Sequence, residues 1–158
     1  MISPASPSAP SHLSRLSRAN LTALLPIVLV LGSFALCALV VPVMVPAAIG
    51  DDWVYAVSVF RLLESGEVHI LDLSVVALLF QIGWGALFGL LLGPTFGALR
   101  LSTVVATFIG GLACYGVARE LGVDRPASAL AAAAYLFNPL AFVLAYTFMT
   151  DPHFTALL

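Results

Sequence analysis

The chain has no lysine, and other charged residues are scarce. Its 158 residues include 6 arginines and 8 acidic residues, so that only 9% are charged and the formal net charge is −2 at pH 7. A soluble domain carries about 25% charged residues. This low charge excludes an ordinary soluble domain and a disordered chain. The lack of a basic surface excludes a nucleic-acid-binding protein, because nothing would hold a phosphate backbone.

Cysteine is also rare. The two cysteines, Cys37 and Cys114, lie inside apolar runs. Such residues are typical of small buried hydrophobic side chains, so we expect neither a metal ligand nor a disulfide from them.

Apolar residues make up most of the chain, at 61% with a mean hydropathy of +1.10. Four runs contain no Asp, Glu, Lys or Arg, namely residues 19–50, 73–99, 101–118 and 126–150. A helix needs about 20 apolar residues to cross the hydrocarbon core of a bilayer. The sequence therefore predicts an all-α protein, a polytopic transmembrane helix bundle in the cell membrane.

The first 20 residues form a different region. They are rich in serine and proline, and we expect a disordered cytoplasmic tail, because Arg15 and Arg18 before the first span favour a cytoplasmic N-terminus. The run Leu21–Val45 is too long for a signal-peptide core and predicts a retained first transmembrane helix. Residues 21–158 then form one domain.

The first external loop is expected to contain juxtamembrane helices. Asp51–Ser65 is amphipathic, with Trp53 on its apolar face, and is typical of a helix that lies in the membrane interface. The apolar segment Val75–Leu92 carries Gly85 and Gly89, which form with Gly93 a ridge of small residues suited to close helix packing.

The number of spans decides where the acids lie. If Val75–Leu92, Arg100–Ala118 and Ala127–Ala145 all crossed the bilayer, Asp51 and Asp151 would face opposite sides. The loop between the last two segments, with its two arginines, would also lie outside, against the positive-inside tendency. Both conflicts vanish if the first of the three stays on the outer side, so we predict that it does not span.

Several stretches in a fixed order resemble one enzyme family. They are Gly50-Asp51-Asp52-Trp53-Val54-Tyr55-Ala56, Leu62-Leu63-Glu64-Ser65-Gly66-Glu67, Ala98-Leu99-Arg100-Leu101-Ser102, and Asn138-Pro139-Leu140 leading to Met149-Thr150-Asp151-Pro152. Together they resemble the N-terminal part of the membrane glycosyltransferases that use polyprenyl-phosphate sugars, which include protein O-mannosyltransferases, lipid A aminoarabinose transferases and Rgt-type sugar transferases. Because those enzymes are several times longer, we expect this chain to be a truncated N-terminal part of such a domain.

The resemblance implies a function and a set of residues. It implies transfer of a sugar from a polyprenyl-phosphate donor to a hydroxyl of a lipid, glycan or protein acceptor on the outer face of the membrane. Asp51 matches the family's catalytic base and Asp151 its second external acid. The two acids are also candidate ligands for a divalent cation, Mg²⁺ or Mn²⁺. The family's Lys-Pro-Pro-like segment is missing, so a phosphate ligand within this chain must be arginine.

We predict substrate contacts from four further residues. Arg61 and Arg100 are candidate phosphate ligands, because a guanidinium can bind two phosphate oxygens. Asp52 and Tyr55 belong to the same motif as Asp51 and are expected to contact substrate.

Structural alternatives exist for most of these residues. Each of Asp51, Asp52 and Asp151 can instead cap a helix, and of the adjacent pair one can cap while the other faces a cavity. Arg61 can form a solvated ion pair with Glu64, and Arg100 can extend to the membrane interface. A non-catalytic membrane subunit or a transporter fragment is the alternative function.

Overall fold

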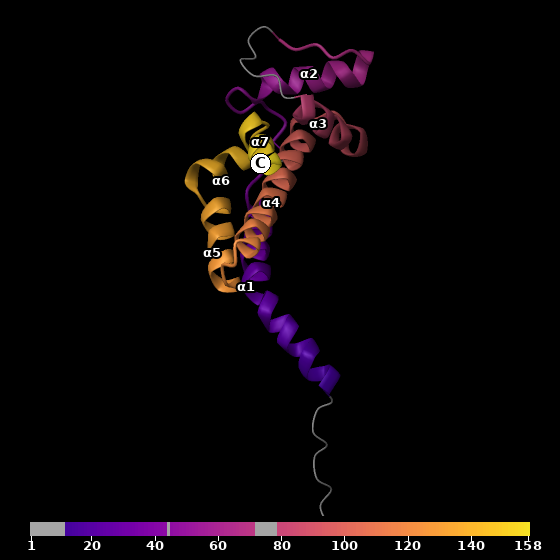
Figure 1. Cartoon of the computed structure of the whole chain (residues 1–158). Helices are drawn as coiled ribbons and strands as arrows, with labels where there is room; N and C mark the ends of the chain where they lie inside the picture. The colour runs from indigo at the N-terminus through magenta and orange to yellow at the C-terminus, as the bar shows by residue number, and fades with distance from the viewer. Residues whose placement is uncertain (1–11, 44, 72–78) are drawn as a thin grey trace, which may run out of the picture.

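The structure, a computed structural model, describes residues 12–43, 45–71 and 79–158, with side chains from residue 22 onward. In these ranges every regular element is an α-helix, as predicted (Figure 1). The helices are α1 (His12–Val40), α2 (Asp52–Ser65), α3 (Leu79–Leu92), α4 (Phe96–Glu120), α5 (Arg125–Leu136), α6 (Pro139–Ala145) and α7 (Thr150–Leu157).

α1 differs at both ends from the expected span. It begins at His12, inside the stretch that we expected to be disordered, and ends at Val40 rather than Val45. Residues 12–20 contain no proline or glycine, so nothing in them stops a helix that extends back from the apolar run. At the other end, the residue before Pro42 disfavours helical backbone, which stops the helix.

α4 is the central helix and contacts α1, α3, α5, α6 and α7. It begins at Phe96, where the Thr95 hydroxyl accepts a hydrogen bond from the Ala98 amide at 3.2 Å. We expected the helix to open at Arg100, which instead lies in its second turn. With 25 residues, α4 is about 37 Å long, enough to cross a hydrocarbon core of about 30 Å.

Glycines let these helices approach closely. A β-carbon at Gly85 would lie 2.7 Å from the Phe148 ring, and one at Gly89 would lie 2.6 Å from Leu63. The predicted packing role of Gly85 and Gly89 is therefore confirmed. It is wrong for Gly93, the third glycine of the ridge, which follows the end of α3 with φ +89° and would have nothing within 4 Å of an added β-carbon. A second pair, Gly110 and Gly111 on α4, packs in the same way against the side chains of α5.

α5 and α6 are two helices where one span, Ala127–Ala145, was expected. They meet at an angle of 64° across Asn138, whose side-chain oxygen accepts hydrogen bonds from the amides of Leu140 and Ala141. Pro139 is the first residue of α6, where its missing amide hydrogen costs no hydrogen bond. α5 itself begins at an Asp124 cap, after Gly122 ends the preceding turn with φ +81°.

Among the residues that the structure describes, two helices are long and apolar enough to span a membrane, α1 over Thr22–Val40 and α4 over Phe96–Glu120. The bent pair α5–α6 makes a third if it counts as one span. α3 has only 14 described residues, about 21 Å, which is shorter than a hydrocarbon core. Residues 72–78, the start of the segment that we predicted not to span, lie outside the described part of the chain. The structure is thus compatible with a membrane protein.

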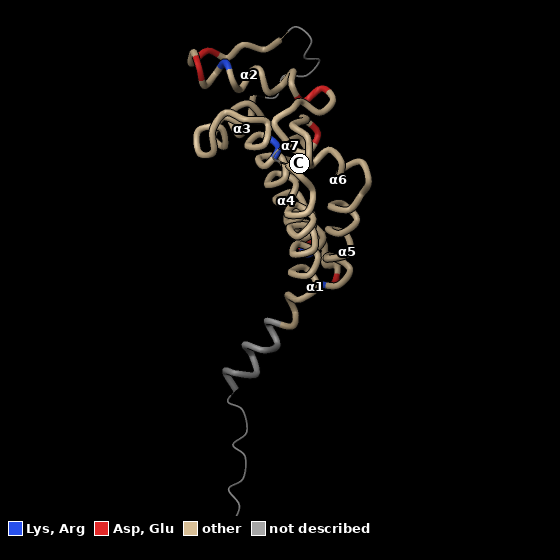
Figure 2. The backbone as a smooth tube through the Cα atoms, turned by 180° about the vertical axis from the view of Figure 1, so that it is seen from behind, with Lys and Arg blue, Asp and Glu red and all other residues tan. Residues whose placement is uncertain are grey.

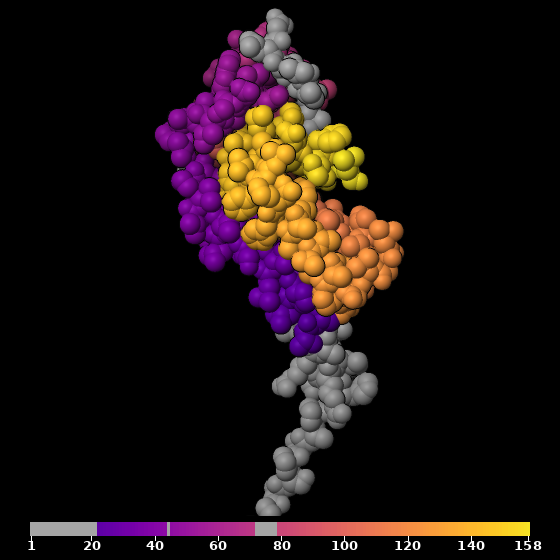
Figure 3. Space-filling model, turned by 90° about the vertical axis from the view of Figure 1, so that its left-hand side faces the viewer, coloured from indigo at the N-terminus to yellow at the C-terminus, as the bar shows by residue number. Residues whose placement is uncertain are grey.

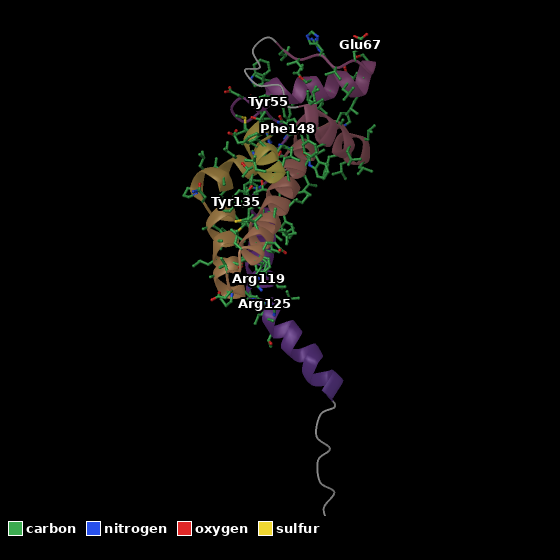
Figure 4. The ribbon with its side chains drawn as sticks, in the orientation of Figure 1. Tyr55, Glu67, Arg119, Arg125, Tyr135 and Phe148 are labelled. Atoms are coloured by element: carbon green, nitrogen blue, oxygen red, sulfur yellow. The ribbon has the colours of Figure 1, made fainter. Side chains whose placement is uncertain are left out.

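Charged residues gather at the two ends of the molecule (Figure 2). Arg119 and Arg125 lie at one end, where α4 turns into α5, whereas Tyr55, Glu67 and Phe148 lie at the other (Figure 4). Between the ends, helix surfaces are apolar and exposed, as at Leu29 and Leu39. An apolar girdle between polar ends is the arrangement that a bilayer requires.

Candidate functional site

The Gly50-Asp51-Asp52 motif forms a turn that leads into α2. Gly50 has φ +61°, a left-handed conformation that other residues rarely adopt. The Asp52 side chain reaches back over the turn, and its Oδ1 atom accepts a hydrogen bond from the Ile49 amide at 2.8 Å. The first and last residues of the motif therefore both stabilise the turn.

Asp52 also forms a buried ion pair with Arg100 of α4. The Asp52 Oδ2 atom lies 2.8 Å from Nη2 and 3.0 Å from Nε of Arg100, and both side chains have 0% exposure. The guanidinium also donates to the backbone carbonyls of Val45 and Ala47. One arginine of α4 thus binds two carbonyls of the connection between α1 and α2 and the first residue of α2.

This ion pair decides which side of α2 is buried. Asp52, Ala56 and Val59 face inward, whereas Trp53 is 40% exposed. The expected apolar face is therefore only partly the buried one: Phe60 and Leu63 pack against the core, whereas Trp53 does not. The reason is that the hydrophobic pattern alone could not show that one of the fully buried positions is a paired carboxylate.

Asp51 has the opposite environment. It is exposed, and its side chain caps no helix and makes no hydrogen bond or ion pair with the described residues. Of the adjacent acids, Asp52 therefore stabilises the fold from inside the protein, whereas the Asp51 carboxylate is accessible at the surface. The predicted substrate contact of Asp52 stays a prediction, although its carboxylate is fully buried and engaged.

Asp151 lies in the first turn of α7 and is exposed. No cap involves its side chain, and it lines a cavity of about 220 Å³ between α4, α5, α6 and α7. Thr107, Tyr135, Asn138 and Thr155 provide further polar atoms there, among apolar walls. The cavity lining does not include Asp51.

The start of α7 lies at the same end of the molecule as α2. The Phe148 ring packs in one buried cluster with Ala56 and Val59 of α2 and Leu99 of α4. The Gln81 side-chain amide of α3 donates to the Phe148 carbonyl at 3.1 Å. Figure 4 shows Tyr55 and Phe148 at this end, far from Arg119. Asp51 and Asp151 therefore begin two helices that share this end, in separate surroundings.

The other predicted contacts are placed as follows. Arg61 is exposed, and its side chain makes no ion pair with Glu64 in the described part of the chain. Tyr55 is half-buried against the α2–α3 cluster. Arg100 is fully buried and bonded to protein acceptors, so it does not extend to the interface, and its predicted contact with a donor phosphate stays a prediction.

The predicted divalent cation finds few ligands. Among the residues that the structure describes, no group of three or more His, Cys, Asp or Glu side chains gathers. Mg²⁺ takes six oxygen ligands in octahedral geometry. One or two carboxylates can supply part of this set, with waters and substrate phosphates as the rest. The cavity lined by Asp151 does not include Asp51, so the described residues do not show the two acids at one cation site, and we derive no step through a metal.

Buried polar side chains on α3 and α7 were not predicted. His153 is fully buried; its Nδ1 atom lies 3.0 Å from the Met149 carbonyl, and its Nε2 atom has no partner among the described residues. Burial lowers the pKa of His153, which the Met149 hydrogen bond opposes in part. The available sequence signal for a helix at His153 was Pro152, a residue favoured in the first turn of a helix.

The helices α5, α6 and α7 form one continuous face of the molecule (Figure 3). Figure 3 shows α5, α6 and α7 toward the viewer, with α1 beside them. The Asp151 cavity lies among these segments and α4.

Comparison with protein-family models, with curated proteins and with solved structures gave no match, so the candidate site is defined by its residues and geometry.

Proposed function

We propose that this protein is a membrane glycosyltransferase that transfers a sugar from a polyprenyl-phosphate carrier to an acceptor hydroxyl. The observation that supports it most is the pair of environments at Asp51 and Asp52. Asp51 is an exposed carboxylate without a partner in the described part of the chain, on a turn whose neighbouring residues are bonded to α4. The resemblance of the ordered motifs to such enzymes supports the same function.

The reaction needs a base and a leaving group. The acceptor oxygen attacks the anomeric carbon of the sugar, the bond from that carbon to the phosphate oxygen breaks, and the lipid phosphate leaves with the bonding electrons. In our proposal Asp51 accepts the proton of the acceptor hydroxyl as general base. Its exposed carboxylate has no internal hydrogen bond to give up first.

Asp151 and Arg61 have supporting roles in the proposal. The Asp151 cavity is lined by hydroxyl and amide groups, which suit the orientation of a hydroxyl-bearing acceptor. Arg61 is an exposed cation on α2 and is the better phosphate ligand of the two predicted arginines. Arg100 already donates four hydrogen bonds to acceptors within the protein.

The proposed topology follows from the charges at the two ends. Arg119 and Arg125 share one end, which the positive-inside tendency assigns to the cytoplasm. α1 begins at that end, so the N-terminus is cytoplasmic in this proposal. Asp51 and Asp151 then face outward, where a polyprenyl-phosphate sugar would meet its acceptor.

Transfer from a radiolabelled polyprenyl-phosphate sugar, by protein expressed from its complete gene and reconstituted in liposomes, tests the proposal. Wild-type protein should label an acceptor, and Asp51→Asn should lower the rate by about 10²-fold or more, as loss of a general base does. The control Glu67→Gln changes an exposed acid at the same end and should retain the wild-type rate. Absence of transfer by wild type, or full transfer by Asp51→Asn, favours the alternative of a non-catalytic subunit or transporter fragment.

A further inference from the structure

The ion pair of Asp52 and Arg100 has more contacts than a cap or a lipid-facing arginine requires. Arg100 donates to one carboxylate oxygen twice and to two backbone carbonyls, and its guanidinium also lies 5.6 Å from the centre of the Phe96 ring. The planar guanidinium can satisfy several acceptors at fixed angles, which a lysine cannot.

The contacts of this pair all converge on the connection that carries Asp51. Arg100 binds the carbonyls of Val45 and Ala47 before the turn, and Asp52 binds the Ile49 amide at its start. Asp51 is the residue between Gly50 and Asp52, so both sides of it are bonded, while its own side chain makes no hydrogen bond or ion pair with the described residues. Asp51 is also adjacent in the chain to the acid that holds the Arg100 cation.

We infer that the Asp52–Arg100 pair is a positioning device for Asp51: it fixes the turn against α4, and it commits the Arg100 cation to Asp52 so that the Asp51 carboxylate stays unpaired. The catalytic meaning of this inference rests on the proposed function. The contacts of the pair and their electrostatic effect on position 51 do not depend on the proposed function. A cation without its own carboxylate attracts other acids, and Asp51 is the acid next to Asp52 in the chain.

A cysteine at position 51 reports the electrostatic part without any enzyme assay. Thiolate, not thiol, reacts with maleimide, and a nearby arginine increases the thiolate fraction. In Asp51→Cys protein, the further change Asp52→Asn leaves Arg100 without its partner and should increase the labelling rate severalfold. Adding Arg100→Gln should return the rate to that of Asp51→Cys alone. Equal rates in the three proteins would overturn the inference.

Kinetics test the positioning part in the otherwise native protein. Asp52→Asn should lower kcat about 10-fold or more with KM changed less than twofold, because misplacement of a reacting group by about 1 Å can cost 10²-fold. Asp52→Glu, which keeps the charge, should regain part of kcat, and Asp52→Asn with Arg100→Gln should be more active than Asp52→Asn alone. A merely structural pair would instead lower the amount of folded protein with kcat per folded molecule unchanged.

Arg100→Lys covers the case in which Asp52→Asn does not fold. It keeps the buried positive charge but loses the planar arrangement of donors. We expect folded protein with lower kcat and little change in KM, and wild-type kcat would contradict the positioning role. If wild-type protein transfers no sugar, the proposed function fails, whereas the labelling experiment still tests the ion pair.

Discussion

α1 and α4 are the two long apolar helices, and they differ in how the rest of the protein uses them. Only 11% of the α1 span is buried inside the protein, against 44% of the α4 span, which is the less apolar of the two. α4 buries Arg100, Ser102, Thr103 and Thr107, whereas the buried residues of the α1 span are Ile27 and Phe34. Hydropathy thus identifies both as candidate spans, but polar content identifies the helix that the others surround.

Breaking the ion pair on α4 should have the largest effect on stability. Arg100→Leu leaves the Asp52 carboxylate buried without its partner, and removing one member of a buried pair costs about 3–5 kcal/mol. Leu39→Ala in α1 changes a side chain that is 84% exposed and is the matched control, with an expected effect within about 0.5 kcal/mol. Thermal unfolding of both variants in detergent measures the difference. Equal unfolding temperatures would contradict the contrast between the two helices.

Glycines provide the next comparison. A β-carbon at Gly111 of α4 would lie 2.8 Å from three atoms of Leu136, so Gly111→Ala should destabilise the protein by about 1–3 kcal/mol. Gly32 of α1 has open space around it, so Gly32→Ala should instead stabilise the helix by up to about 1 kcal/mol through its better helix propensity. Opposite shifts in unfolding temperature are expected. A stabilising Gly111→Ala would show that α5 does not pack on α4 as described.

Much of this fold could be predicted from composition and from residues that cap or break helices. The apolar runs located the long helices, Gly122 and Asp124 marked the turn between α4 and α5, and Asn138-Pro139 marked the bend. These signals are local, so a single sequence contains them. The predicted start of α4 at Arg100 is four residues late, because the helix is capped by Thr95 directly after the Gly93-Pro94 break.

The candidate site was predictable only in part. The pattern showed that Asp51 and Asp52 differ by about 100° in direction, but not which one faces inward. That choice depends on Arg100, 48 residues away, and on backbone carbonyls that no side-chain pattern encodes. The cavity at Asp151 likewise requires α4, α5 and α6 to converge, which is a property of the packed helices.

A helix cap on α4 gives a smaller effect than its core glycine. Thr95→Ala removes the hydroxyl that accepts a hydrogen bond from the Ala98 amide, and loss of such a cap costs about 1 kcal/mol. Thr95→Ser keeps the hydroxyl and should unfold at nearly the wild-type temperature. If Thr95→Ala also unfolds there, the first turn of α4 does not depend on its cap.

The smallest effect is confined to acidic pH and concerns α7, the helix that packs on α4 through buried groups. Burial lowers the pKa of His153 in the folded protein below the value of about 6.5 that an unfolded chain gives. As the pH falls below 6.5, the unfolded chain therefore binds a proton that the folded protein does not, and stability decreases. His153→Asn keeps a donor for the Met149 carbonyl but does not titrate. Between pH 7.5 and pH 5, the unfolding temperature should fall less steeply for His153→Asn than for wild type. The control His69→Asn, at an exposed position, should follow wild type. Parallel curves for His153→Asn and wild type would show that His153 is not buried in the folded protein.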